Sequence, residues 1–585
     1  MVWGILRKQI LLPVMTITVL LVIILISVVL ILTLSESKEL KETDKKYYKN
    51  GAVAADVGKC SDIGVKILKQ NGSAVDSAIA TLFCQGVTNV HSSGIGGGLF
   101  MVVYVKKSRR AWFYNGREKA PSNASRDMFV NNTLAAKQGA LAVGVPGEVS
   151  AMHKAWKEHG KLPWKDLVQP AIDLCKNGFP LSKALYGRMV TKKDILYNDT
   201  GFRKLLFKKD GTMLKTNEIL INPELGNTLE IIAEDPMSFY QGSIAKGIVS
   251  DIQGSGGIIT RDDLKNYEAT RTNALRVNLD KNHTIWTSQP PSSGPVFAMI
   301  LQILKGFQFS SEDNDGDESL IRSYHRIVEA FKFSYAYRAL LGDPDHEDGV
   351  KETVNNMTNA SFTEDLRKKI DDNKIHNVSY YGGFYSDWND DGTTHLSVLS
   401  KNGDAVALTS TINTSFGSKI RSPTLGIIYN NEMDDFSTPG LVNVFGVEPS
   451  PRNFIKAGKR MMSSMSPSVT VDDLGNARFI LGASGGTRIT TGTALVFLNH
   501  LWFGLDLEES VERPRLHHQL VPTYIRLEKT KRYRMKQTIL NGLKKLGHKY
   551  KFLINSSTVQ AISIDRQGRI YAVSDSRKFG RATGY

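Results

Sequence analysis

Residues 393–412 carry the clearest hydrophobic pattern of the chain. Apolar side chains alternate with polar ones on either side of Asn402-Gly403, and this period of two predicts a pair of half-buried strands. Asn-Gly is a strong signal for the tight turn of a β-hairpin. The sequence therefore predicts an antiparallel hairpin whose first strand opens at Thr393.

Two registers of this hairpin are open. A two-residue turn would pair Thr393 with Ile412, whereas a one-residue bulge would pair it with Thr411. Either register brings Thr411 and Asn413 beside Thr393. The start of the first strand is therefore expected to gather hydroxyl and amide side chains.

Helical and strand patterns fill most of the remaining chain. Helices are expected at residues 57–85, with a break at Gly72 and an N-cap at Ser73, over most of 147–307, at 324–341 and from about 491. Strands are expected at 51–55, 99–104, 111–114 and around a turn at 469–475, with a closing hairpin at 560–573. Residues 364–391 are polar and are predicted to be mostly loop.

An uncharged apolar run at residues 10–34 is long enough to cross a bilayer as a helix. A cleavable signal peptide is the alternative, but the run is too long and lacks an Ala-x-Ala-like site. We expect an uncleaved anchor, preceded by a cytoplasmic tail of residues 1–9 and followed by a Lys/Glu-rich stalk at residues 35–50.

Glycosylation sequons decide the expected orientation of this anchor. Lys and Arg flank the run on both sides, so the positive-inside rule is ambiguous. Sequons after the run occur at Asn71, Asn123, Asn131, Asn198, Asn282, Asn356, Asn359, Asn377 and Asn555. We expect a single-pass type II plasma-membrane protein with its body outside the cell.

Composition describes a globular body and excludes several function classes. The chain has 585 residues, is 41% hydrophobic and carries a net charge of +16. Because the basic residues are spread along the sequence, solvated loops and attraction to a membrane surface are favoured over a nucleic-acid groove. Three cysteines are too few for a disulfide-built scaffold, and no Cys/His spacing typical of a metal site occurs.

The junction Gly392-Thr393 suits a self-cleaving N-terminal nucleophile. A charged Asp-Asp-Gly segment leads into a hydroxyl residue that opens a strand. Cleavage before Thr393 would free an α-amine whose pKa near neutrality lets it act as general base for the hydroxyl of the same residue. Taken alone, a Gly-Thr pair before a strand is more often a plain turn.

Further motifs occur in order along residues 52–585. They are Asn89-Val-His-Ser-Ser-Gly-Ile-Gly-Gly-Gly98, Asn115-Gly-Arg-Glu118, Tyr324-His-Arg-Ile-Val-Glu-Ala-Phe331, Asp391-Gly-Thr-Thr-His-Leu-Ser-Val398, Ser410-Thr-Ile-Asn413, Asn430-Asn-Glu-Met-Asp-Asp-Phe436, Ser463-Ser-Met465, Gly485-Gly-Thr487 and Ser574-Asp-Ser-Arg-Lys578. Together they resemble the γ-glutamyltransferase (γ-glutamyl transpeptidase) family of N-terminal nucleophile hydrolases, in its membrane-anchored animal type.

This resemblance implies an α+β fold, a four-layer αββα sandwich behind the transmembrane helix. It implies cleavage into a large subunit of residues 51–392 and a small catalytic subunit of residues 393–585, which stay associated. The expected activity moves the γ-glutamyl group of glutathione or related conjugates to water, amino acids or dipeptides, without a cofactor. A catalytically inactive surface homologue with a binding role is the alternative, and an amidase or acylase on other substrates is a third class.

The resemblance also assigns the expected catalytic groups. Thr393 is the expected nucleophile, and Thr411 is expected to orient it by a hydrogen bond. The backbone N–H groups of Gly485 and Gly486 are expected to form the oxyanion hole, since no side chain blocks the approach.

A γ-glutamyl group presents an α-carboxylate and an α-ammonium, so its pocket needs both charges. The carboxylate is expected to bind Arg117, Ser463 and Ser464. The ammonium is expected to bind Asn413, Glu432 and Asp435. Without the resemblance, these charged residues would more often be surface ion pairs or solvated loops.

The resemblance implies a disulfide as well, because Cys60 and Cys84 match positions that are bridged in animal relatives. Cys175 is then the odd thiol and, given its apolar helical surroundings, is expected to be buried and inert. One departure from the family pattern concerns Thr414-Ser415, where many animal members carry a bulky pair. This departure makes Asn413 part of a sequon, and we expect Asn413 to be unmodified because a glycan there would block the pocket.

Overall fold

The compact body of the molecule runs from Tyr48 to Tyr585. The computed structural model describes residues 24, 25, 27, 47–382, 385–386, 392–442, 448–529, 534–553 and 556–585. The expected anchor at residues 10–34 falls outside the described residues except for Ile24, Leu25 and Ser27, which are helical. Within the part of the chain that is described, no helix is long and apolar enough to cross a membrane.

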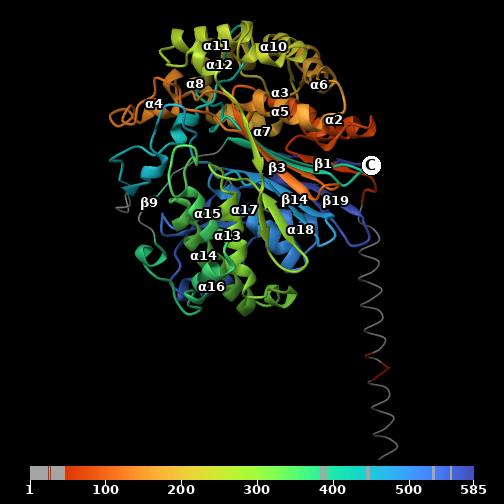
Figure 1. The fold of residues 1–585 in the computed structure, drawn as a ribbon, viewed down its shortest axis with the longest axis vertical. Coiled ribbons are helices and arrows are strands. Elements are labelled where there is room, and N and C mark those ends of the chain that lie inside the picture. Colours follow the sequence, from red (N-terminus) through yellow and green to blue (C-terminus); the bar gives the residue numbers. More distant parts are fainter. Residues whose placement is uncertain are drawn as a thin grey trace, which may run out of the picture. The chain divides into compact units, whose positions relative to one another are not determined.

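Two antiparallel sheets form the centre of the body (Figure 1). The seven-stranded sheet has the order β20 (Thr583–Gly584), β1 (Ala52–Ala55), β10 (Thr393–Leu399), β11 (Ala405–Thr411), β2 (Gly98–Val105), β3 (Arg110–Gly116) and β6 (Thr270–Asn273). The six-stranded sheet has the order β19 (Ile570–Ser574), β18 (Thr558–Ile564), β14 (Ala477–Ser484), β13 (Ser468–Val471), β8 (Thr284–Thr287) and β7 (Leu275–Asn278). The first residue of β10 is Thr393, so the predicted nucleophile opens a central strand.

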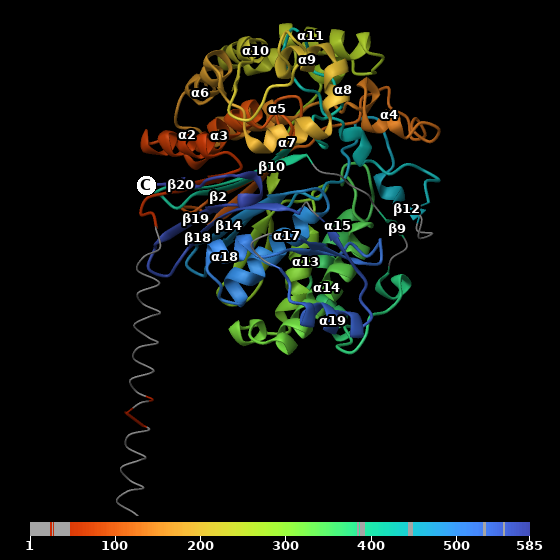
Figure 2. The ribbon, with the colours of Figure 1, turned by 180° about the vertical axis from the view of Figure 1, so that it is seen from behind.

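Successive residues of the seven-stranded sheet face two different cores, as the pleat of a strand requires. Val53 and Val398 belong to the core beneath one helical layer, whereas Ala54 and Ala407 belong to the core shared with the second sheet. Helices cover the outer face of each sheet (Figures 1 and 2). The body is therefore an α+β fold with the layers helix, sheet, sheet and helix, and the predicted α+β class is confirmed.

The helical layers are built from segments far apart in the sequence. On the side of the seven-stranded sheet they are α2 (Gly58–Lys69), α3 (Ala74–Thr88), α5 (Glu148–His159), α6 (Trp164–Asn177), α7 (Lys183–Thr191), α8 (Lys193–Asn198), α9 (Thr200–Leu206), α10 (Pro223–Glu234), α11 (Ser243–Gly254) and α12 (Arg261–Lys265). On the other side they include α13 (Gly294–Lys305), α14 (Asp317–Arg338), α15 (Val350–Thr358), α16 (Ala360–Lys368), α17 (Arg488–Phe497), α18 (Leu507–Glu512) and α19 (Gln537–Lys545). The predicted N-cap at Ser73 is present, in a capping box with Asp76.

The hairpin of β10 and β11 adopts the bulged register. Thr393 pairs with Thr411 and Leu399 with Ala405, and the N–H of Ser400 donates to the carbonyl of Asp404 at 3.0 Å. The loop therefore has three residues and ends at Gly403, whose φ of 84° suits a residue without a side chain. This extra residue moves Ile412 out of the pair and places Thr411 directly opposite Thr393.

The two sheets lie close together behind the nucleophile strand. His395 lies fully buried on β10, and its ring bonds the hydroxyls of Thr409 and Ser397 at 2.8 and 3.2 Å. A Cβ atom added to Gly482 of the facing sheet would lie 2.3 Å from this ring. Gly482 is thus required by the close approach of the sheets, and burial lowers the pKa of His395 to about 3, so the ring is neutral.

One predicted region departs from the structure. Residues 147–307 were expected to be mostly helical, but they also contain the strands β6, β7 and β8. These strands are four residues long and rich in Thr, Asn and Arg, and two of them lie at sheet edges. A short, largely polar edge strand buries too few side chains to show a clear period of two, which explains why the pattern missed it.

Candidate active site

Thr393 is the first residue of β10, the strand between β1 and β11, and has 5% of its surface exposed. Its hydroxyl donates to the hydroxyl of Thr411 at 3.3 Å. The hydroxyl of Thr411 in turn donates to the carbonyl oxygen of Gly392 at 2.9 Å and accepts the N–H of Asn413 at 2.8 Å. A hydrogen-bonded chain therefore runs from the predicted nucleophile to the carbonyl of the bond that it is predicted to break.

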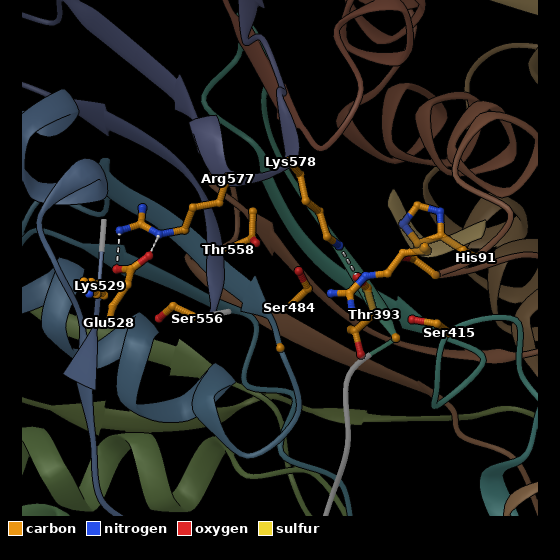
Figure 3. Close-up of a pocket in the computed structure, with 14 residues that line it drawn as sticks. His91, Thr393, Ser415, Ser484, Glu528, Lys529, Ser556, Thr558, Arg577 and Lys578 are labelled. Atoms are coloured by element: carbon orange, nitrogen blue, oxygen red, sulfur yellow. Dashed lines mark hydrogen bonds and ion pairs between the residues drawn. The ribbon is translucent and has the colours of Figure 1, made fainter. Parts of the chain in front are cut away.

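A partly buried ion pair holds the other side of Thr393. Lys578 donates to the carbonyl oxygen of Thr393 (Figure 3). It also donates to the carboxylate of Asp56 at 2.8 Å. Asp56 is 2% exposed and also accepts the hydroxyl of Thr394 at 2.7 Å and the amide of Gln560 at 2.5 Å. This network fixes the backbone of the nucleophile. The sequence indicated Lys578 only as part of a family motif and gave no signal for Asp56.

The predicted oxyanion-hole glycines connect β14 to α17. Gly485 and Gly486 have φ values of 126° and 61°, a region that residues with a side chain rarely adopt. A Cβ atom on Gly485 would also lie 2.9 Å from the backbone of Ser557. Gly485 lines the same cavity as Thr393, so its backbone is available to a molecule that occupies the cavity.

That cavity has a volume of about 280 Å³ and opens beside Thr393 (Figure 3). Its remaining lining residues are His91, Ser92, Arg188, Gly392, Ser415, Ser484, Gly485, Glu528, Lys529, Ser556, Thr558, Arg577 and Lys578. Four of these carry positive charge and one carries negative charge, so the cavity favours an anionic or zwitterionic occupant.

Arg117 forms a second, fully buried charged cluster. Its guanidinium donates to Glu432 and to Asp435, and Glu118 lies 3.6 Å away. Burial raises the pKa of Glu118 to about 8 although Arg117 opposes the shift, and burial likewise raises the pKa of Glu432 well above its usual value. Burial therefore favours the protonated forms of Glu118 and Glu432. The sequence predicted two of these acids as ligands but gave Glu118 no role.

The remaining predicted substrate residues border this cluster. Arg117 donates to the carbonyl oxygens of Met461 and Met462 at 3.3 and 3.1 Å, immediately before Ser463. The hydroxyl of Ser464 accepts a hydrogen bond from the buried Arg338 at 3.3 Å, a contact that sequence reasoning missed. All six predicted substrate residues are buried, and none of them lines the 280 Å³ cavity.

Asn413 links the predicted substrate residues to the nucleophile. Its backbone bonds Thr411, and its side-chain amide donates to the carbonyl of Asn431 at 2.9 Å. Asn431 directly precedes Glu432. Two hydrogen bonds and one peptide bond therefore connect Thr411 to Glu432 of the charged cluster.

The cysteines lie as the sequence predicts. Cys60 and Cys84 form a disulfide between α2 and α3, with 5.4 Å between their Cα atoms. Cys175 is a buried free thiol on α6, and burial raises its pKa to about 12. Such a thiol is not reactive at neutral pH.

One cluster of metal-ligating residues occurs among the described residues, at His325, Glu329 and His548. The two imidazoles bond each other at 2.8 Å, and Lys332 donates to Glu329 at 2.7 Å. Because the ammonium of Lys332 already neutralises the carboxylate, we assign no metal to this cluster.

Comparisons with known proteins agree with this arrangement. Residues 60–585 match the family described as Gamma-glutamyltranspeptidase. Scoloptoxin SSD14 of Scolopendra dehaani is 42% identical, with 92% of each chain covered. Glutathione hydrolase 2 of Arabidopsis thaliana is 41% identical, covering 92% of this chain and 94% of the relative, and glutathione hydrolase 5 proenzyme of Rattus norvegicus is 34% identical, covering 92% and 93%.

Solved structures share the fold. The cephalosporin acylase from Bacillus halodurans superposes with a TM-score of 0.79 at 24% identity, covering 92% of this chain and 96% of that one. The gamma-glutamyltranspeptidase of Helicobacter pylori superposes with a TM-score of 0.52 at 28% identity, covering 55% of this chain and 91% of that one. By the extent of the family match and the identity to its relatives, the chain belongs to the gamma-glutamyltranspeptidase family.

Proposed function

We propose that this protein is a self-cleaving γ-glutamyl transferase and hydrolase that takes the γ-glutamyl group from glutathione and related conjugates. The observation that carries the proposal is the hydrogen-bonded chain from the hydroxyl of Thr393 through Thr411 to the carbonyl of Gly392. The names of the glutathione hydrolase relatives support the choice of substrate. No observation favours the inactive surface homologue.

The same hydroxyl serves two reactions in succession. First, Oγ1 of Thr393 attacks the carbonyl carbon of Gly392, the peptide C–N bond breaks, and water hydrolyses the resulting ester to leave a free α-amine on Thr393. The hydrogen bond from Thr411 stabilises the negative charge that develops on the carbonyl oxygen of Gly392. In the mature protein, the freed α-amine accepts the hydroxyl proton while Oγ1 attacks the γ-amide carbon of the substrate. The amine portion of the substrate leaves with this proton. Water or an acceptor amine then attacks the acyl-enzyme ester and releases the glutamyl group from Thr393.

The charged cluster around Arg117 suits the glutamyl end of such a substrate. Arg117 is paired with Glu432 and Asp435. A γ-glutamyl group brings one carboxylate and one ammonium, so it can replace these pairs without changing the net charge of the buried cluster. Its carboxylate would bind Arg117 and its ammonium the two acids, which avoids the cost of an unpaired buried charge.

A position outside the cell belongs to the same proposal. We propose a type II protein anchored in the plasma membrane by residues 10–34. Two observations support it. The sequon residues Asn71, Asn123, Asn131, Asn198, Asn282, Asn356, Asn359 and Asn377 are exposed, whereas Asn413 is buried and bonded to Asn431. The disulfide between Cys60 and Cys84 suits an oxidising compartment.

Intact mass of the body tests the proposal, with wild type compared with Thr393→Ala and Thr393→Ser. We expect wild type to yield two chains that separate between Gly392 and Thr393 and to release aniline from a γ-glutamyl anilide. Thr393→Ala should remain one chain without activity, and Thr393→Ser should recover cleavage because it retains a hydroxyl. An uncleaved, inactive wild type would instead support the inactive surface homologue.

A further inference from the structure

One end of the cavity beside Thr393 contains polar groups that neither reaction above uses. This end is lined by His91, Arg188 and Ser415, and Figure 3 shows His91 and Ser415 on the same side of Thr393, away from Glu528 and Arg577. None of the residues expected to bind the glutamyl group lies here. This end of the cavity is therefore available to a group other than the glutamyl end of the substrate.

Arg188 brings an uncompensated charge to this end. It projects from α7, is partly exposed, and burial lowers the pKa of its guanidinium. Among the described residues, its side chain has no carboxylate within ion-pair distance and no hydrogen-bond acceptor. A partly desolvated guanidinium without an anion is costly, and a bound carboxylate would offset this cost.

His91 supplies a second unpartnered group. It is 2% exposed, and its buried Nδ1 has no hydrogen-bond partner in the described part of the chain. Burial first, and then the charges of Lys578 and Arg188, hold the pKa of His91 well below its usual value. The ring is therefore neutral, and the tautomer protonated on Nδ1 can donate to an anion without adding charge.

Two other cations of the cavity are already paired, and the fourth, Lys529, lies at the opposite end beside Glu528 (Figure 3). Lys578 is held by Asp56, and Arg577 bonds Glu528 at 2.6 Å and Asp575 at 3.0 Å. The unmatched positive charge of the described lining thus includes Arg188, next to the unpartnered His91. The small side chain of Ser415 leaves this end open.

We propose that His91 and Arg188 bind the terminal carboxylate of the peptide portion of the substrate, on the amine side of the γ-amide bond. This inference rests on the proposed function, since it places the glutamyl end at Arg117 and the peptide end in the cavity. The same site takes the terminal carboxylate of a dipeptide acceptor when the acyl-enzyme is resolved by transfer. A volume of 280 Å³ corresponds to about nine water molecules at ~30 Å³ each, which is sufficient for a dipeptide.

The test compares two donors that differ only in this carboxylate, glutathione and its glycine amide. In wild type, we expect kcat/KM to be about 10- to 100-fold higher for glutathione than for its glycine amide. This is the gain in affinity that one charge-assisted hydrogen-bonded pair provides. Arg188→Gln should reduce this ratio at least tenfold, and Arg188→Lys should retain part of it. Lys192→Gln, which removes an exposed cation next to the same helix, should keep the wild-type ratio.

The outcomes separate the two proposals. Release of aniline from a γ-glutamyl anilide by wild type, together with equal ratios in wild type and Arg188→Gln, would overturn the carboxylate site and leave the proposed function intact. No release by wild type would overturn the proposed function and, with it, the site. Acceptor KM values give a measurement on wild type alone: equal values for glycylglycine and glycylglycine amide would overturn the site even if Arg188→Gln does not fold.

Discussion

Thr411→Val removes a hydroxyl from the predicted cleavage site while keeping the shape of the side chain. This hydroxyl accepts from Thr393, accepts the N–H of Asn413, and donates to the carbonyl of Gly392 at 2.9 Å. Valine can do none of these, although it suits a buried strand equally well. We therefore expect the variant to fold and to cleave itself much more slowly than wild type.

The magnitude follows from the bond to Gly392. During self-cleavage, negative charge develops on that carbonyl oxygen, and loss of one donor aimed at such an oxygen slows a reaction about 10²- to 10³-fold. This corresponds to roughly 3–4 kcal/mol of transition-state stabilisation. The buried N–H of Asn413 also loses its acceptor, which should cost about 1–3 kcal/mol of folding stability.

The assay is a time course of the intact precursor after synthesis, resolved by mass into one or two chains. Thr409→Val is the matched control, because Thr409 lies on the same strand and its hydroxyl bonds only the ring of His395 among the described contacts. We expect the control to cleave at close to the wild-type rate and Thr411→Ser to recover most of it. Cleavage of Thr411→Val at the wild-type rate would refute the role of this hydroxyl.

Three further predictions concern buried groups. Replacing Cys60 and Cys84 by serine opens a link across 24 residues and should lower the free energy of unfolding by about 3–4 kcal/mol, measured by denaturant titration against wild type. Burial raises the pKa of Glu148 to about 8, so the native state binds the extra proton and this group's contribution to stability falls as pH rises from about 5 to 8. The free energy of unfolding of Glu148→Gln, measured by denaturant titration, should therefore rise relative to that of wild type by about 1.4 kcal/mol per pH unit across this range. The same pH dependence in both proteins would contradict the raised pKa of Glu148. Cys175 should resist iodoacetamide at pH 8 until the protein is denatured, and rapid labelling of native protein would contradict its burial.

Local signals explain what the sequence predicted well. The hairpin from Thr393 depends on alternation and on Asn402-Gly403, which act within a few residues, and the sequence limited its register to two possibilities. Only the backbone of Gly403 decides between them, because its left-handed conformation adds a third loop residue. Whether the assigned catalytic residues perform their predicted roles stays a prediction, although the structure bonds Thr393 to Thr411 and places Gly485 in the same cavity as Thr393.

Long-range charge pairing explains what the sequence missed. Lys578 and Asp56 are 522 residues apart, and neither has a local pattern that distinguishes it from a surface charge. The sequence analysis assigned Arg117, Glu432 and Asp435 to one substrate site but did not predict that they pair. In the structure, Arg117 forms ion pairs with both acids. Burial of Glu118 beside them depends on packing, which periodicity does not encode.

The order of strands in the seven-stranded sheet has a consequence for the lifetime of the protein. β1 precedes the proposed cleavage site but lies between β10 and β20, which follow it, and β11 pairs with β2 across the same division. After cleavage, the two products would share this sheet and could not part without breaking it at several ladders. A covalent connection that guided these strands together would no longer exist, so a matured molecule that unfolds should not readily refold. Maturation would thus replace a reversible folding equilibrium by kinetic stability. Each molecule would fold once, and its lifetime would be set by the rate at which it unfolds.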